Sequence, residues 1–403
     1  MEKSKKPKIR FKGFTDDWEQ RKLGDVVKEI TRNDPELEAP IMMITANNGF
    51  IEQSERYAFN NAGESLKKYI LLKKGELAYN HGASKLRPYG SCFALTTAEN
   101  ARIPFVYHCF SAENQNAEFM SIELNGAEIE NQLRKIVSSG ARMDGLLNIS
   151  FDEYTSVSVL LPGTEEQDRI ADFFRHLDNL ITLHQRKLDK LKNVKKSMLE
   201  KMFPKQGSTV PEIRFTGFTN DWEQRKFKEL YSKSGEKNDG SIGINKNITV
   251  ATMQFKGDVK VSTPEYLKTY YTFNLGDIAF EGHQSKEFRY GRFVENDIGN
   301  GIVSHIFSVF RPIQEYDLHF WKYAINNEEL MQHILSRSTK ASTMMHDLVT
   351  DDFLNETFLV PSLSEQEKVG SILHNLDNLI TLHQRELEKL QNIKKSMLEK
   401  MFV

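Results

Sequence analysis

The sequence of 403 residues contains only two cysteines, Cys92 and Cys109. Two thiols give neither a disulfide framework nor the ligand spacing of a zinc site, and such scarcity is typical of proteins in a reducing cytoplasm. No run of about 18 apolar residues occurs, so we expect no membrane-spanning helix. The basic N-terminus, Met1 to Lys12, is not followed by an apolar stretch and does not resemble a secretory signal. We therefore expect a cytoplasmic protein.

Sequence motifs of nucleotide-binding and metal-dependent enzymes are also missing. Neither GxxxxGK[ST] nor GxGxxG is present, and neither are HExxH, paired CxxC and GxSxG. The Asn-Pro-Pro-aromatic tetrapeptide of amino-methyltransferases does not occur. The adjacent acids Asp16-Asp17 and Asp351-Asp352 are expected to lie in surface turns. We therefore predict no catalytic residues, no metal site and no cofactor bound by this chain.

An excess of charge of one sign is lacking as well. The chain has 54 Lys and Arg against 56 Asp and Glu, a net charge of −2. Basic residues cluster locally, with six among the first twelve positions and pairs at Lys73-Lys74 and Lys394-Lys395. Such clusters are ordinarily solvated surface, and a binding face depends on where cations gather. Charge alone leaves the partner open.

The sequence is built from two copies of one frame. IRFKGFTDDWEQRK at Ile9–Lys22 returns as IRFTGFTNDWEQRK at Ile213–Lys226, and LDNLITLHQR at Leu177–Arg186 returns unchanged at Leu376–Arg385. KKSMLEKMF also occurs twice. Between the matching ends of each copy the sequences have diverged almost completely. Such a duplication indicates two domains of one plan, in which the frame is kept and the interior is replaced.

The C-terminal segment of each copy is predicted to be a long helix. Thr164–Gln167 and Ser364–Glu367 have the pattern of capping boxes, and apolar residues follow at spacings of three and four. About 38 residues at ~1.5 Å each give a rod of roughly 55 Å. A helix this long with one apolar stripe needs a partner, so we expect the two copies to pair as an antiparallel coiled coil about a pseudo-twofold axis. The predicted seam consists of Leu177, Ile181, His184, Leu188 and Leu191 with Leu376, Ile380, His383, Leu387 and Leu390, the two histidines being packed residues and not metal ligands.

The divergent interiors have mixed α and β patterns. YILLKKGELAY and YYTFNLGDIAF indicate strands with turns at Gly75 and Gly276, whereas Ala127–Val137 and Leu330–Leu335 have helical patterns. The predicted fold class is α+β, with two mixed α/β domains separated by two long helices. The expected boundaries are 1–163 for the first domain, 164–204 for the first helix, 205–363 for the second domain and 364–403 for the second helix.

A polar loop recurs in both interiors. YNHGASKLRPYGS at Tyr79–Ser91 and FEGHQSKEFRYGR at Phe280–Arg292 both contain Ser-Lys, then arginine, then Tyr-Gly. Lysine and arginine on such loops can reach phosphates, and Arg, Asn, Gln and His can pair with base edges. An ordinary polar loop is the alternative interpretation. Under the binding hypothesis, shared residues contact the DNA backbone and differing residues read different sequences.

Nearby polar residues extend the candidate set. Thr45–Gly49 and Ala251–Lys256 present similar groups. The candidate DNA-contacting residues are Asn47, Asn48, Asn80, His81, Ser84, Lys85, Arg87, Tyr89, Arg142, Gln254, Lys256, His283, Gln284, Ser285, Lys286, Arg289, Tyr290, Arg292 and Lys340.

These features together carry a family resemblance. A frame beginning FTDDWEQRKLGD, a variable interior, and a proline followed by an EQ-containing long helix ending in KKSMLEKMF, all duplicated, resembles the specificity subunit of a type I restriction-modification system. The resemblance covers the whole chain. It implies two target-recognition domains, each reading one half of a split, asymmetric DNA site, and helices that set the spacing and dock partner subunits. It supplies no catalytic residues to carry over.

The resemblance also implies partners. Double-stranded DNA, modification subunits (two of them) and ATP-dependent restriction subunits are expected, with S-adenosylmethionine, ATP and Mg bound by those subunits and no cofactor in this chain. Two other classes stay open. One is a fused nuclease or methyltransferase, against which the missing cofactor loops count. The other is a coiled-coil adaptor without DNA specificity, which explains the helices but not the basic loops.

Overall fold

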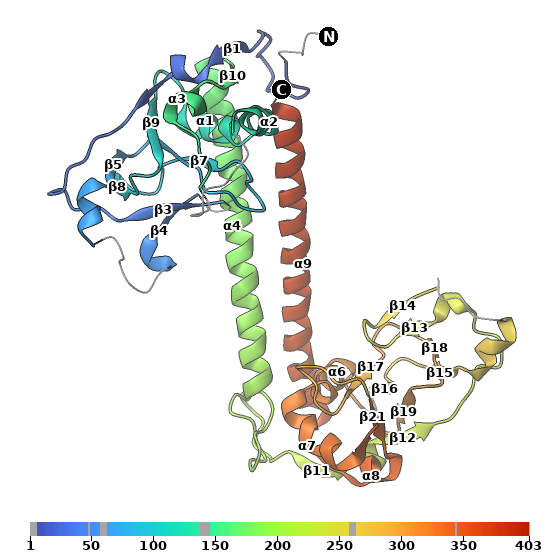
Figure 1. Ribbon diagram of the computed structural model, residues 1–403. Coiled ribbons are helices and arrows are strands. Elements are labelled where there is room, and N and C mark those ends of the chain that lie inside the picture. The colour runs from blue at the N-terminus through green and yellow to red at the C-terminus, as the bar shows by residue number, and fades with distance from the viewer. Residues whose placement is uncertain are drawn as a thin grey trace. The chain divides into compact units, whose positions relative to one another are not determined.

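The computed structural model describes residues 6–46, 49–56, 63–137, 146–257, 263–342 and 345–402. Contacts within the chain divide it into two units. The first unit comprises Met1–His184 and Glu386–Val403, and the second comprises Gln185–Arg385. Two long helices, α4 (Thr164–Lys201) and α9 (Leu363–Met401), are shared between the units (Figure 1). The first half of α4 and the second half of α9 belong to the first unit, and the other two halves belong to the second. Each unit therefore combines one divergent interior with two helix halves.

In the first unit, the interior is organised around a four-stranded antiparallel sheet of order β2-β9-β6-β7. Antiparallel strand pairs β1-β10, β3-β4 and β5-β8 surround it. The elements are β1 (Glu19–Lys22), β2 (Val27–Glu29), β3 (Met42–Thr45), β4 (Gly49–Glu52), β5 (Ile70–Lys73), β6 (Leu77–Asn80), β7 (Ser91–Ala94), β8 (Asn100–Ile103), β9 (His108–Ala112), β10 (Ser158–Leu161), α1 (Ala117–Leu124), α2 (Ala127–Ile136), α3 (Phe151–Thr155), and the 3-10 helices at Leu23–Asp25, Gln53–Glu55 and Gly63–Lys68.

The second unit repeats this arrangement with the sheet order β12-β19-β16-β17. A hairpin of β20 and β21 is described in this unit, and the corresponding segment of the first unit lies outside the described residues. The elements are β11 (Glu223–Lys226), β12 (Tyr231–Ser234), β13 (Ile248–Thr249), β14 (Gln254–Phe255), β15 (Tyr271–Phe273), β16 (Ile278–Glu281), β17 (Arg292–Glu295), β18 (Gly301–Val303), β19 (Ser308–Pro312), β20 (Thr339–Ala341), β21 (His346–Leu348), β22 (Thr357–Val360), α5 (Phe227–Leu230), α6 (Leu318–Ile325), α7 (Glu328–Ser338), α8 (Thr350–Asn355), and the 3-10 helices at Ile244–Lys246 and Pro264–Thr269.

One of the two central strands of each sheet, β6 in the first and β16 in the second, is buried on both faces. In β6, Leu77 and Tyr79 pack into a core with α1 and α4, whereas Ala78 faces a second core that includes residues of β3, β5 and β8. In β16, Ile278 and Phe280 likewise pack into one core, whereas Ala279 packs into another. Because successive side chains of a strand point to opposite faces, burial on both sides gives these strands their continuous apolar runs. The strands and turns predicted from these runs are confirmed.

The two helix halves in the first unit run antiparallel. Lys394 of α9 pairs with Asp178 of α4 at 2.5 Å. Phe174, one turn earlier in α4, packs on Phe402 beyond the end of α9, with 6.1 Å between the ring centroids. An earlier position in one helix therefore meets a later position in the other.

The halves in the second unit are antiparallel as well. Lys195 of α4 pairs with Asp377 of α9 at 2.6 Å, repeating the lysine-aspartate contact of the first unit with the helices exchanged. Met202, the residue after the end of α4, shares a hydrophobic core with Val369, early in α9. The antiparallel pairing predicted from the duplicated sequence is confirmed within each unit.

The predicted seam faces inward along both helices. None of its residues is exposed, in contrast to the leucines at Leu180, Leu183, Leu379 and Leu382 on the same helices. Buried seam residues are Leu177, Leu188, Ile380, His383 and Leu387, and half-buried ones are Ile181, His184, Leu191, Leu376 and Leu390. The apolar stripe that was read from the sequence is therefore withdrawn from solvent.

A buried ion pair joins each interior to the start of a long helix. Arg10 donates two hydrogen bonds to Glu166, at 2.8 and 2.6 Å, and a third to the backbone oxygen of Asp16. Arg214 and Glu365 repeat the bidentate contact at 2.7 and 2.8 Å. The planar guanidinium matches both carboxylate oxygens, so the pair fixes direction as well as distance. The hydrogen bond to Glu166 raises the pKa of Arg10.

The glutamine next to that glutamate holds the first interior helix. Gln167 donates to the backbone oxygen of Pro162 at 2.9 Å and accepts from the backbone N–H of Asn116, the N-cap of α1. Gln366 makes the same two kinds of contact in the second unit. The predicted capping box is wrong here, because the Gln167 side chain is committed to these tertiary partners. The recurring Glu-Gln pair is instead the joint between helix and interior.

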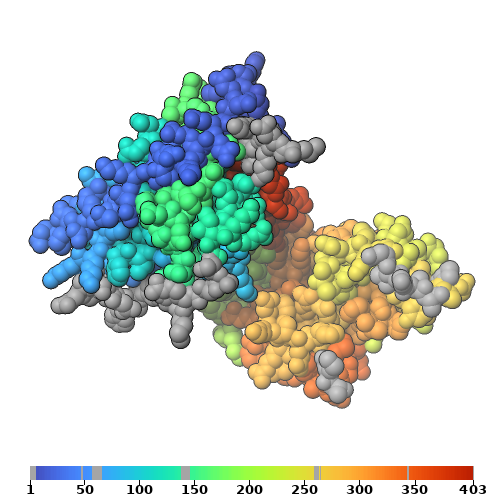
Figure 2. Space-filling model, turned by 45° about the horizontal axis from the view of Figure 1, so that its top comes forward, coloured from blue at the N-terminus to red at the C-terminus, as the bar shows by residue number. Residues whose placement is uncertain are grey.

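Each interior also begins on the end of a long helix. The backbone N–H of Ile9 donates to the oxygen of Lys400 in α9, and that of Ile213 donates to Lys201 in α4, both at 2.9 Å. The red end of α9 accordingly lies beside the blue N-terminal segment (Figure 2). Each unit also has a cluster of three aromatic rings that joins the interior to the end of the long helix. The cluster consists of Trp18, Phe119 and Phe402 in the first unit and of Trp222, Phe320 and Phe203 in the second.

Loss of a buried ion pair should lower the free energy of unfolding more than loss of an exposed one. The side chains of Arg214 and Glu365 are only 15% and 2% exposed, so Arg214→Ala leaves an unpaired buried carboxylate and should lower the free energy of unfolding by about 3 kcal/mol. The matched control is Lys196→Ala, which removes an exposed pair with Glu200 and should cost less than about 1 kcal/mol. Urea unfolding of both variants measures the difference. Equal losses would contradict the assigned role of the buried pair.

Candidate nucleic-acid interface

The predicted contact residues of the first unit that the structure describes lie at one edge of its sheet. Strand β6 pairs with β9 so that Tyr79 lies opposite His108. The end of β6 and the start of β9 therefore meet at the same edge. Residues 81–90, which join β6 to β7 and are called the first edge loop below, share this edge with the turn 104–107 between β8 and β9.

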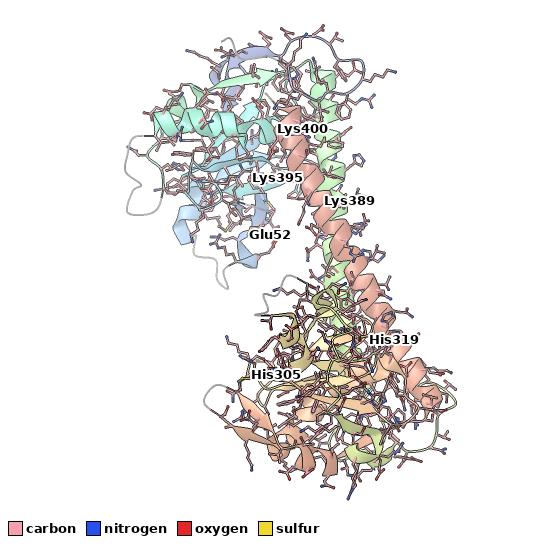
Figure 3. All side chains as sticks on the ribbon, turned by 90° about the vertical axis from the view of Figure 1, so that its right-hand side faces the viewer. Glu52, His305, His319, Lys389, Lys395 and Lys400 are labelled. Carbon is pink, nitrogen blue, oxygen red and sulfur yellow. The ribbon has the colours of Figure 1, made fainter. Side chains whose placement is uncertain are left out.

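The second unit forms the same edge from its own strands. Phe280 of β16 lies opposite Ser308 of β19. The second edge loop, residues 282–291, consequently meets the turn 304–307, which carries His305 (Figure 3). The two loops quoted from the sequence thus occupy equivalent positions in the two units.

Shared residues give both loops the same backbone shape. Ser84 exchanges two hydrogen bonds of 3.0 Å with the backbone of Arg87, and Ser285 does the same with Phe288 at 2.9 and 3.0 Å. In each loop a glycine with positive φ, Gly90 or Gly291, follows three residues after the turn. At Gly90, φ is 82° and an added Cβ would lie 2.6 Å from the backbone oxygen of Asn80. The common serine and glycine are therefore required by the loop fold.

One shared cation remains exposed in each loop. Lys85 and Lys286 follow the two equivalent serines and are both exposed. Neither ammonium group forms an ion pair with another of the described residues. Two free cations at the same place on the same loop are suited to contact phosphate.

The arginines of the two loops are not equivalent, as the different order of residues between Ser-Lys and Tyr-Gly indicates. The serine turn places Arg87 opposite Phe288, not opposite Arg289. Arg87 is half-buried and donates to the backbone oxygen of Asn125 at 2.7 Å, and burial lowers the pKa of its guanidinium. Arg289 is exposed, with its guanidinium 5.5 Å from the ring centre of Tyr290. Arg87 braces the loop, whereas Arg289 is available at the surface.

Two further first-unit candidates are committed to internal contacts. His81 is 7% exposed, and its ring nitrogens lie 2.9 and 2.6 Å from the backbone oxygens of Leu147 and Val106. The Asn80 amide donates to Ile44 and accepts from the N–H of Gly82. Both side chains tie neighbouring segments to the edge and do not present free polar groups.

The second unit leaves more of its predicted residues exposed. Arg292 is half-buried, pairs with Glu281 at 2.7 Å and donates to the backbone oxygen of Ala251. Tyr89 and Tyr290 are half-buried in their units, and Ser84 and Ser285 serve the turns. The exposed polar candidates of the second unit are Gln254, Lys256, His283, Gln284, Lys286, Arg289 and Lys340. Asn47, Asn48 and Arg142 lie outside the described residues.

Apolar side chains at these edges were missed by the sequence analysis. Leu86 in the first edge loop is 63% exposed, and Phe105 in the neighbouring turn is 52% exposed. In the second unit Ile306 is 67% exposed at the corresponding turn. Such side chains can contact a thymine methyl group. Their residue types resemble core positions, so only their placement at the edge reveals them.

No metal or membrane element was found among the described residues. No group of three or more His, Cys, Asp or Glu side chains there could hold a metal ion. No helix in that part of the chain has both the length and the apolar composition needed to cross a membrane. Both cysteines are buried, and burial raises the pKa of the Cys92 thiol to about 12.

The edge loops need their glycines because of close backbone contact. Gly90→Ala should cost more stability than Gly75→Ala, although φ is 82° at Gly90 and 83° at Gly75. Both substitutions carry the strain of positive φ, about 1–2 kcal/mol, but no atom lies within 4 Å of a Cβ at Gly75. Thermal unfolding separates strain from the clash with Asn80. Equal shifts in melting temperature would show that the loop yields freely.

The sequence matches one family model twice. The model described as "Type I restriction modification DNA specificity domain" covers residues 15–193 and 219–392. A curated relative is the type I restriction enzyme MjaVIII specificity subunit from Methanocaldococcus jannaschii, 23% identical over 278 residues. That match spans 65% of this chain and 65% of the relative's length.

Two solved structures were compared with the chain. The crystal structure of a type I restriction-modification system S subunit from M. genitalium has a TM-score of 0.55 and 12% identity, and the match covers 99% of both chains. The HsdS subunit from Thermoanaerobacter tengcongensis has a TM-score of 0.45 and 14% identity, with 96% of both chains covered. At these identities the first match concerns the fold.

Proposed function

The chain belongs to the type I restriction-modification DNA specificity family, and we propose that it reads a bipartite, asymmetric sequence in double-stranded DNA. Residues 1–163 form one target-recognition domain and 205–363 the other, each reading one half-site with its edge loop. The observation that carries the proposal is that the two edge loops have the same turn, glycine and exposed lysine but different exposed side chains. An asymmetric site requires two domains that contact the DNA backbone in the same way and contact the bases with different side chains.

The contacts divide by chemistry. Lys85 and Lys286 reach phosphate, where affinity is independent of sequence. Sequence is read by hydrogen bonds and apolar contacts at base edges. In the first domain the exposed apolar residues Leu86 and Phe105 supply such a surface, whereas the second presents polar groups that include Gln284 and Arg289. The two domains accordingly prefer different bases.

The long helices are proposed to set the spacing of the half-sites and to dock modification subunits. Leu180 and Leu183 are 45% and 59% exposed on α4, and their repeat equivalents Leu379 and Leu382 are 44% and 51% exposed on α9. Lys389, Lys395 and Lys400 project from α9 (Figure 3). Exposed apolar pairs within a polar surface are suited to a protein partner. Two equivalent pairs match two modification subunits.

The remaining chemistry is assigned to those partners. Modification subunits would bind S-adenosylmethionine, and restriction subunits would bind ATP and Mg, while this chain supplies the sequence specificity and no catalytic group. An adaptor without DNA specificity is the second candidate. It accounts for the helices and their exposed leucines, but it leaves the matched lysines and differing side chains of the edge loops without a role.

The phosphate contacts give the direct test. Lys85→Ala and Lys286→Ala, in the full chain assembled with modification subunits, should each weaken binding to cognate and unrelated duplexes by a similar factor and reduce the salt slope by about 1. The control is Lys74→Ala, at the opposite end of β6, where Lys74 pairs with Glu99. Fluorescence anisotropy over a salt series measures both quantities. If the edge-loop variants behave like Lys74→Ala, or if the wild type shows no sequence preference, the proposal fails.

A further inference from the structure

The hairpin β20–β21 is fixed against the second edge loop. The backbone N–H of His346 donates to the oxygen of Gly282 at 2.8 Å, and His283 bridges to Met345. A Cβ at Gly282 would lie 2.1 Å from the backbone oxygen of His346, so the approach is possible only with glycine. The hairpin therefore provides a rigid support behind the loop.

A chain of side-chain hydrogen bonds runs through this support to the loop surface. The hydroxyl of Thr339 donates to the backbone oxygen of Leu335 at 2.7 Å and lies 3.3 Å from His346 Nδ1. Because that hydroxyl has used its proton, it can only accept from Nδ1–H. A neutral imidazole that is protonated at Nδ1 has an acceptor at Nε2. The amide nitrogen of Gln284 lies 2.5 Å from His346 Nε2 and donates to it.

This series of hydrogen bonds determines which polar groups Gln284 presents to solvent. His346 is 8% exposed, whereas Gln284 is exposed. With one amide N–H bound to His346, Gln284 retains its carbonyl oxygen and one N–H. An acceptor beside a donor matches the N6 amino group and N7 of adenine, the base that glutamine reads in a bidentate manner.

We infer that Gln284 reads an adenine in the half-site of the second domain, with His346 and Thr339 as positioning residues that fix the orientation of its amide. The inference rests on the proposed function. It names the contact that makes the second domain's preference specific.

The first unit lacks this device at the equivalent place. There the backbone N–H of Leu147 donates to the oxygen of His81 at 2.9 Å, and Gly82 bridges to Leu146. This pairing puts Leu147 where the second unit has His346, and Ala83 where it has Gln284. Neither of these two described side chains can relay or present a hydrogen bond, so this arrangement is described only in the second domain.

The test uses base analogues with the full chain assembled with modification subunits. A randomised duplex pool first defines the wild-type site. Each adenine of the second half-site is then replaced by 7-deazaadenine, which lacks the N7 acceptor, or by purine, which lacks the N6 amino group. At one position both analogues should weaken wild-type binding by about 10- to 100-fold. Gln284→Ala should show the same loss on the natural duplex and no further loss with either analogue there.

The positioning role is tested by two variants of Thr339. Thr339→Val removes the acceptor for His346 Nδ1–H, so the imidazole proton can move to Nε2 and the amide of Gln284 turns its N–H groups outward. The ratio of the affinity for the natural duplex to the affinity for the analogue duplex should then fall towards one. Thr339→Ser should restore the wild-type ratio. Both variants should keep the wild-type response at the first half-site.

The outcomes separate the two proposals. A wild-type complex without any preferred sequence overturns the proposed function. A defined site whose second half lacks adenine, a Gln284→Ala variant that remains sensitive to the analogues at every adenine, or a Thr339→Val variant that discriminates like the wild type overturns the Gln284 assignment alone.

Discussion

The bidentate ion pair between a frame arginine and the glutamate at the start of a long helix is the contact on which the rest of the structure depends. Arg10 with Glu166, and Arg214 with Glu365, hold each recognition domain to its helix through two hydrogen bonds between nearly buried groups. A single hydrogen bond would allow the domain to rotate about it, whereas the planar pair defines an orientation. Under the proposed function, a domain that reads one half-site at a set spacing needs such a fixed orientation.

This joint allows the edge loops to differ. The ion pair and the glutamine contacts use residues of the repeated frame, whereas the edge loops lie in the divergent interior. Within the loops, the serine turn and the glycine with positive φ preserve the backbone course. Different side chains then pack behind a loop backbone that has the same path in both units. The ring of His81 lies between two backbone oxygens in the first unit, and the Thr339–His346 pair contacts Gln284 in the second. Specificity can therefore change without altering the scaffold.

The sequence predicted the features that depend on local pattern or on duplication. The two long helices, their antiparallel pairing and the strands that end at Gly75 and Gly276 follow from periodicity, turn residues and repetition. Periodicity also located the seam, including buried His383. These features need no knowledge of which distant segments meet.

Features that depend on distant partners could not be predicted. His81 has the residue type of a base reader, but Leu147 and Val106 supply backbone oxygens that turn it inward. Arg87 has the residue type of a phosphate or base contact, but its guanidinium donates to the backbone oxygen of Asn125. Gln167 fits a capping pattern, but Asn116 and Pro162 compete for its amide. In each case a tertiary hydrogen bond overrode a correct reading of the residue's local chemistry.

The central claim is that each interior carries its own half-site preference on a common frame. It is tested most directly by replacing residues 227–356 with residues 23–157, between the matching strands that begin and end each interior. The chimera, assembled with modification subunits, is then used to map the bound sequence from a randomised duplex pool. The account predicts an interrupted palindrome of the first half-site with the original gap between the halves. A site that stays asymmetric, or a palindrome with a different gap, would contradict it.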